Sequence, residues 1–278
     1  MKRVSYREEK ENIDRILSNC FKTANETDDA EFIASLIKHA NLSPWDDRNA
    51  LKNFEQLFRF VGEATLSGNF SGEDLMRISL LLYCHFFEWS EMFNLFYDLS
   101  KISKGERAGN TIQSSNENRD LYWKELNNLT KGDINDEKII NARALIAKLD
   151  NGQIGINKKI NTIKDSNEEL GAILEDLFNG VLRNGFSHNS YSFKDEGILI
   201  INEANSTETV IVWDEVNRLY NLTKFFAGCL IEKWKEYLSN TSGKLLKGKY
   251  CEYKITYGDN QKFKIEPIKG SIPIGIYY

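Results

Sequence analysis

The chain has 278 residues, of which 41% are hydrophobic and 28% are charged, and its formal net charge is −5. These values are ordinary for a globular protein that buries a core without disulfides or metal ions. The acidic balance excludes a protein that coats nucleic acid through its overall charge, so any nucleic-acid contact should be local. The four cysteines form no CxxC pair, and three dispersed histidines give no zinc-ligand spacing, so we expect no metal and no other cofactor.

The start of the chain, Met1–Arg3, is charged and is not followed by a secretory signal. No uninterrupted apolar run reaches membrane-spanning length, because polar residues interrupt the apolar-rich stretch 78–96. We therefore expect a cytoplasmic protein that makes no contact with membranes.

The first hundred residues place apolar side chains at helical spacing. We predict helices over residues 6–20, 28–40 and 48–63, and interpret residues 1–70 as an N-terminal helical extension. A longer helix follows Ser71, with its body at 75–99. That helix is apolar on nearly every face, which favours a central position or coverage by a second subunit.

The middle of the chain begins with a polar segment, 101–120, that is rich in Ser, Asn and Gly and predicts a flexible surface loop. Further helices are predicted at 122–129 and 136–149. Ser166 and Glu169 then form an S-x-x-E capping-box pattern, which predicts one amphipathic helix from there to Leu182.

After His188 the periodicity changes to that of strands. The β-branched runs at 197–201 and 209–213 predict a hairpin, and Asp214 is placed to cap a last long helix. Residues 241–278 alternate like strands and hold seven lysines against three acids, which predicts a small basic C-terminal β-hairpin tail. Its lysines could contact RNA or, as is more common, protect an exposed strand edge from aggregation.

The sequence Arg183-Asn-Gly-Phe-Ser-His188 closes the helix expected after Ser166. It resembles the signature of the HEPN superfamily, which is an Arg, four to six residues and then a His. Many members carry Asn directly after the Arg, as Asn184 does here. The resemblance covers residues 71–240 and implies a mainly α fold: a HEPN-like helical bundle with a short β-hairpin after the motif.

A histidine that titrates near neutrality can act as acid and base, and an arginine fork matches the geometry of a phosphate. The resemblance accordingly implies a metal-independent endoribonuclease, in which His188 is the acid–base group and Arg183 holds the phosphate. It also implies a homodimer with two motifs at a shared cleft, a toxin, antiviral-defence or stress role, and in some members a regulatory or antitoxin partner.

Four further residues are candidates for contacts to substrate or to the motif. Asn184 and Ser187 lie within it, Tyr191 follows it, and Glu88 belongs to the earlier long helix. Each has a structural alternative: a local helix cap for Asn184 and Ser187, a half-buried hairpin position for Tyr191, and an ordinary ion pair for Glu88.

Three functions remain open from the sequence. The first is the ribonuclease, and the second is a non-catalytic HEPN module that binds RNA, nucleotide or a partner protein. The third is a helical interaction protein in which Arg183 and His188 only bond to backbone at a helix end. On an ideal helix the two side chains point about 140° apart. Convergence would require the helix to end or distort between them, and Gly185 offers that freedom.

Overall fold

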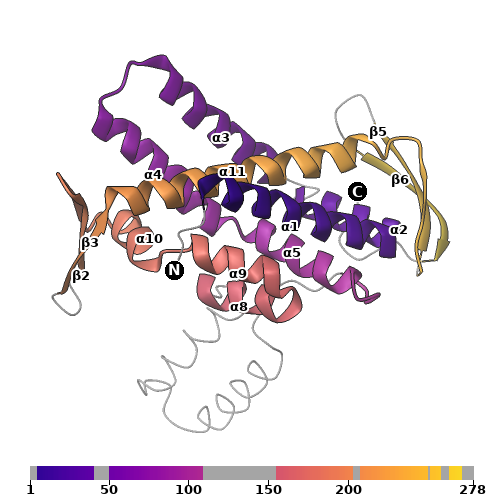
Figure 1. Ribbon diagram of the computed structural model, residues 1–278. Helices are drawn as coiled ribbons and strands as arrows, with labels where there is room; N and C mark the ends of the chain where they lie inside the picture. Colours follow the sequence, from indigo (N-terminus) through magenta and orange to yellow (C-terminus); the bar gives the residue numbers. More distant parts are fainter. Residues whose placement is uncertain are drawn as a thin grey trace, which may run out of the picture.

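The computed structural model describes residues 5–40, 50–108, 155–202, 207–249, 251–257 and 263–270. In these ranges the chain is mainly helical and carries two small antiparallel sheets, which confirms the predicted mainly α class. Helix α11 (Trp213–Ser239) runs along the molecule, with one sheet at each of its ends (Figure 1). None of the described helices is long and apolar enough to cross a membrane.

The N-terminal helices follow the predicted pattern, with some differences at their ends. The structure places them at α1 (Tyr6–Thr27), α2 (Asp29–Ala40), α3 (Ala50–Ser67), α4 (Gly72–Glu88) and α5 (Ser90–Ile102). Helix α1 begins at a complete capping box, in which the Ser5 side chain accepts from Glu8 N and the Glu8 side chain accepts from Ser5 N. It also continues a full seven residues beyond the expected end at residue 20.

The single long helix expected over 75–99 is wrong, because the chain leaves helical geometry at Trp89, with φ −72° and ψ 86°. The indole of Trp89 stacks on Phe54 at 4.5 Å and on Trp234 at 5.7 Å, with interplanar angles of 14° and 10°. Rings from α3 and α11 therefore hold the residue that separates α4 from α5. The two helices consequently pack on different partners, α4 on α3 and α10, α5 on α2 and α8.

The C-terminal half alternates short helices with strands. Its elements are α8 (Ile156–Ser166), α9 (Glu168–Leu177), α10 (Gly180–Ser187), β1 (Tyr191–Lys194), β2 (Gly197–Asn202), β3 (Thr207–Val212), α11, β4 (Leu245–Lys247), β5 (Cys251–Tyr257) and β6 (Phe263–Gly270). Of the loop expected at 101–120, residues 101 and 102 belong to α5, and 109–120 lie outside the described residues. So do the helices expected at 122–129 and 136–149.

The cap expected at Ser166 is wrong, since Ser166 is the last residue of α8. Asn167 takes the cap position instead, and its side chain accepts a hydrogen bond from Leu170 N at 3.1 Å. Helices α8 and α9 then cross closely at Gly171, where a Cβ would lie only 2.3 Å from the Cα of Lys164. Glycine is required there because two backbones meet.

The helix expected to continue to Leu182 is also interrupted, between α9 and α10. The buried phenol of Tyr83 occupies the interruption: its hydroxyl donates to Leu177 O at 3.0 Å and accepts from Asn179 N at 2.8 Å. The Asn179 side chain then starts α10 by accepting from Leu182 N at 3.0 Å. A side chain of α4 thus fixes the direction in which the motif helix begins.

Both expected hairpins are present, and each belongs to a three-stranded meander. Strand β2 pairs with β3 and also with β1, which the sequence did not predict. Strand β4 was likewise missed and pairs with β5 at the other sheet. The cap role expected for Asp214 is wrong, because Val212 takes that position and Asp214 lies in the first turn, where a negative charge favours the helix end.

The buried apolar residues form one cluster that extends from Ile13 in α1 to Ile255 in β5. Helix α1 packs on α11, α2, α5 and α9, and α2 packs on β4 and β5. The predicted domain boundaries near residues 70 and 240 stay predictions, but α1 and α2 bury their apolar faces in the same core as the later helices. This shared core is what holds α4, α10 and the first sheet in place.

Candidate functional site

The Arg183–His188 motif occupies α10, a helix of eight residues. The helix ends in a backbone Schellman motif: Ser190 N donates to Gly185 O at 2.8 Å, and Asn189 N donates to Phe186 O at 3.1 Å. Asn189 takes the left-handed conformation that this ending requires, with φ 57°. His188 is therefore the capping residue of the helix, and its side chain is exposed.

Gly185 does not interrupt the helix, which ends two residues later at Ser187, between Arg183 and His188. Its function is a close approach to the first sheet, because a Cβ at this position would lie 2.4 Å from Cγ2 of Ile200 in β2. Only the absence of a side chain lets α10 lie against β2 at this distance. The motif helix is thus seated on the sheet at one side and on α4 at the other.

Arg183 is held by two acceptors. One terminal nitrogen, Nη2, donates to Glu88 Oε1 at 2.6 Å, and the other, Nη1, donates to Asn184 Oδ1 at 2.9 Å. The Arg183 side chain is 21% exposed and that of Glu88 is 41% exposed. Its Nε is buried and has no acceptor within the described residues. The structure therefore brings together three of the predicted site residues, from two helices.

Helix α4 also contacts α10 at Cys84, whose thiol donates to Arg183 O at 3.8 Å and is hydrogen-bonded to Ser187. Burial raises the pKa of the Cys84 thiol to about 11, although the hydrogen bond from Ser187 opposes the shift. The thiol is therefore protonated near neutral pH and is not a nucleophile. This contact makes Ser187 part of the helix interface.

Asn184 and His188 are four residues apart and lie on one face of α10, with Cβ atoms about 5–6 Å apart. The hydrogen bond from Arg183 Nη1 to Asn184 Oδ1 links the guanidinium to a residue of this face. His188 itself has no hydrogen bond or ion pair through its ring to any residue that the structure describes.

Tyr191 lies apart from Arg183 and belongs to a row of aromatic rings. Its hydroxyl is hydrogen-bonded to Arg77, and its ring lies 5.1 Å from that of Phe186 and 5.4 Å from that of Phe193. Of the two alternatives for Tyr191, the structure shows the half-buried hairpin position. On the α4 side, His85 Nδ1 lies 3.7 Å from Glu88 Oε2, so a second exposed histidine borders the motif.

Sequence reasoning missed a second histidine cluster, in the core. His39 is fully buried between Glu91, 2.7 Å from Nδ1, and Asp98, 2.9 Å from Nε2, and Lys38 Nζ lies 3.2 Å from the same Asp98 oxygen. Burial lowers the pKa of His39, but the two carboxylate hydrogen bonds outweigh it and the net pKa is raised above 6.5. In the described part of the chain no group of His, Cys, Asp or Glu has the arrangement of a metal site.

Comparison of the chain with protein-family models, with curated proteins and with solved structures gives no match. The resemblance to HEPN proteins therefore stands on the motif and on the order of the elements around it, and stays a prediction.

Proposed function

We propose that the chain is a metal-independent endoribonuclease of HEPN type. One observation carries the proposal: Arg183 is held by Glu88 and Asn184, and Asn184 lies on the same helix face as His188, one turn earlier, while His188 is exposed and its ring has no partner among the described residues. A phosphodiester at this face would have a fixed cation on one side and a free acid–base group on the other.

In the proposed reaction His188 takes the proton from the 2′-hydroxyl of RNA, and the 2′-oxygen attacks the adjacent phosphorus. The bond from phosphorus to the 5′-oxygen breaks, which leaves a 2′,3′-cyclic phosphate and a 5′-hydroxyl. Arg183 binds the non-bridging oxygens as their charge increases. Of its five N–H donors, two are used by Glu88 and Asn184, so donors remain for the phosphate.

The proposed homodimer would supply the acid that protonates the leaving 5′-oxygen, from His188 of the second copy. Support comes from apolar side chains exposed on α10 and on the neighbouring helix α4: Leu81 on α4 is 38% exposed and Val181 on α10 is 46% exposed. Leu81 lies one turn before His85, and Val181 lies one turn before Asn184. An apolar surface that flanks a polar motif suits a self-complementary contact.

The alternative is a non-catalytic module that binds RNA, nucleotide or a partner protein. It is favoured by the short contact of 2.6 Å between Glu88 and Arg183, since a carboxylate already offsets the charge that a phosphate would need. A cytoplasmic location, a defence or stress role and a regulatory or antitoxin partner rest on the family resemblance and belong to the proposal.

The decisive experiment is cleavage of RNA in excess EDTA by the wild type, His188→Ala and Arg183→Ala. His85→Ala is the matched control, because it removes another exposed histidine beside Glu88. We expect the wild type and His85→Ala to release cyclic-phosphate ends, and the two motif variants to cut about 10²–10⁴-fold more slowly.

The proposed dimer is tested in the same cleavage assay with the double variant Leu81→Glu and Val181→Glu. We expect this variant to be a folded monomer that does not cut RNA. Equal cleavage by wild type and His188→Ala would refute catalysis at the motif. Binding of RNA by a folded, dimeric wild type that cuts nothing would establish the non-catalytic alternative.

A further inference from the structure

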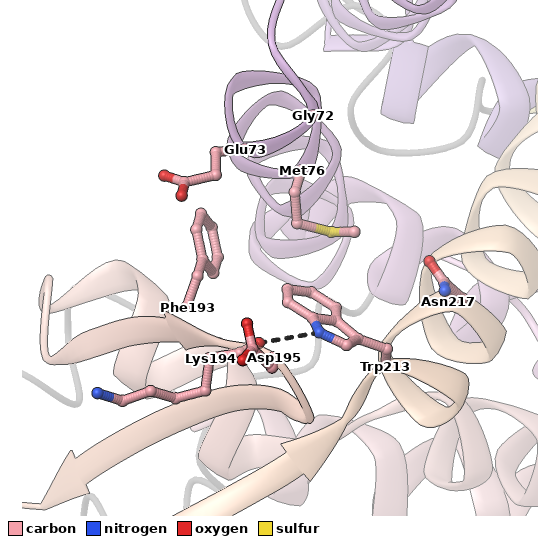
Figure 2. A pocket seen from close by; sticks show the side chains of 8 residues that line it. All are labelled: Gly72, Glu73, Met76, Phe193, Lys194, Asp195, Trp213 and Asn217. Atoms are coloured by element: carbon pink, nitrogen blue, oxygen red, sulfur yellow. Dashed lines mark hydrogen bonds between the residues drawn. The ribbon is translucent and has the colours of Figure 1, made fainter.

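A pocket opens between the first turn of α4, the β1–β2 turn and the start of α11, with a cavity volume of about 430 Å³. Figure 2 shows Phe193, Trp213 and Met76 around one space, with Glu73, Asp195 and Asn217 also lining it. None of these residues was singled out from the sequence as a site residue. The cavity is large enough for a nucleobase and for part of its sugar.

The apolar part of the pocket offers ring faces. The rings of Phe193 and Trp213 lie 5.8 Å apart at 49°, and both side chains are half-buried. Trp213 Nε1 donates to Lys194 O at 3.0 Å, which fixes the indole and uses its only donor. What remains for a ligand is therefore stacking and dispersion, which suit a flat aromatic ring.

The polar part of the pocket offers mainly acceptors, because the side chain of Lys194, which also lines it, extends away from the two rings (Figure 2). Glu73 is already paired with Arg77 at 3.1 Å, whereas the carboxylate of Asp195 and the side-chain amide of Asn217 are exposed and have no partner among the described residues. A carboxylate accepts two hydrogen bonds side by side. Guanine presents two adjacent donors, N1–H and its amino group, adenine and cytosine present one amino group, and uracil presents one N–H between two carbonyls.

A row of rings joins the pocket to the motif. Centroid distances are 5.1 Å from Phe186 to Tyr191, 5.4 Å from Tyr191 to Phe193 and 5.8 Å from Phe193 to Trp213. Phe193 follows His188 by five residues, so the two lie within about 17 Å of each other even if the chain between them is fully extended. That distance corresponds to a few nucleotides of single-stranded RNA.

We infer that this pocket binds an unpaired nucleobase of RNA and prefers guanine to the other bases. The base would belong to the same RNA strand whose backbone lies at the Arg183–His188 motif. The inference rests on the proposed function, because it takes RNA as the ligand. An organic cation is the competing occupant of an aromatic pocket with carboxylates at its edge. The guanidinium of Arg77 already lies 4.9 Å from the centroid of Phe193, which disfavours a second cation there.

The test uses RNA that cannot be cut, so that binding is measured apart from catalysis. A 2′-O-methyl decauridine, with or without one guanine, is titrated against the full-length protein and followed by fluorescence anisotropy. We expect the guanine to tighten binding at least about fivefold. Phe193→Leu and Trp213→Phe should weaken binding of both RNA oligomers. Asp195→Asn should remove only the preference for the guanine-containing oligomer.

Phe60→Leu is the matched control, because Phe60 on α3 is 50% exposed and lies outside the pocket. Thermal unfolding confirms that each variant is folded. Equal affinity for the two strands, or a preference that survives in Asp195→Asn, would overturn the inference. So would competition by tetramethylammonium but not by guanosine monophosphate. Guanine-dependent binding without cleavage of unmodified RNA would support the nucleobase pocket and refute the proposed nuclease activity. Failure of the inference can therefore be distinguished from failure of the proposed function.

Discussion

Two parts of the described structure combine a histidine with charged residues in opposite ways, the buried cluster around His39 and the exposed motif that contains His188. Around His39 both ring nitrogens have carboxylate partners, the side chain has no exposure, and α2 is joined to α5. Around His188 the ring is exposed and without a partner in the described structure, and Glu88, the carboxylate on Arg183, is 41% exposed.

The difference shows how polar residues that support a fold can be told from residues available to a ligand. A buried charge must be paired within the protein, so the groups around His39 are already satisfied and contribute to stability. The exposed imidazole of His188 contributes little to the fold and is free to meet a substrate. Exposure and hydrogen-bond partners therefore separate the two histidines.

We expect the two parts to differ most clearly in stability when each histidine is replaced in turn. His39→Ala leaves Glu91 and Asp98 without their shared partner, and we expect a loss of about 3–5 kcal/mol in the free energy of unfolding. His188→Ala should change that free energy by less than about 0.5 kcal/mol. Urea unfolding followed by circular dichroism measures both. Similar losses in the two variants would show that His188 also has a structural role.

The seating of the motif helix can be tested at Gly185. A methyl group there meets Ile200, so Gly185→Ala should lower the free energy of unfolding by about 1–3 kcal/mol and displace α10. The matched change Gly62→Ala adds a methyl into open space within α3 and should stabilise the protein by up to about 1 kcal/mol. An unchanged stability in Gly185→Ala would mean that α10 is not tightly packed on β2.

The effect of pH on stability should be smaller, and His39 is the histidine for which we expect it. Because the folded pKa of His39 lies above its unfolded value, its stabilisation is complete below about pH 6.5 and is lost as pH rises through the folded pKa. The unfolding free energy of wild type minus that of His39→Gln should therefore decrease between pH 6 and 9. A difference that increases with pH would contradict an imidazolium held by Glu91 and Asp98.

The sequence predicted the elements whose signal is local. Helices α1 to α3 and the β2–β3 and β5–β6 hairpins follow from periodicity, which depends only on neighbouring residues. The interruption at Trp89 could not be predicted, because rings of Phe54 and Trp234 from distant helices hold it. The interruption before α10 did carry a signal, since Asn179 and Gly180 form an N-G pair that is typical of a turn.

The residues of the candidate site likewise differ in whether their position could be predicted from neighbouring sequence. The place of Arg183, Asn184 and His188 at the end of a helix was predicted from the sequence. For Glu88 the sequence left open a contact with the motif or an ordinary ion pair, and the structure shows an ion pair with Arg183. The His39 cluster could not be inferred, because its carboxylates lie 52 and 59 residues away in sequence. The pocket at Phe193 and Trp213 was hidden because β1 has only four residues, too few for a clear alternation.

Glu88 and Arg183 are separated by 95 positions in the chain, and this spacing has a consequence during protein synthesis. A ribosome that has released α4 has not yet translated α10, so the nascent chain carries only one side of the motif. Assembly of the site waits for β2, against which Gly185 is seated, to emerge as well. For a protein proposed to cut RNA, this order of emergence leaves the motif incomplete in the nascent chain until β2 has been translated.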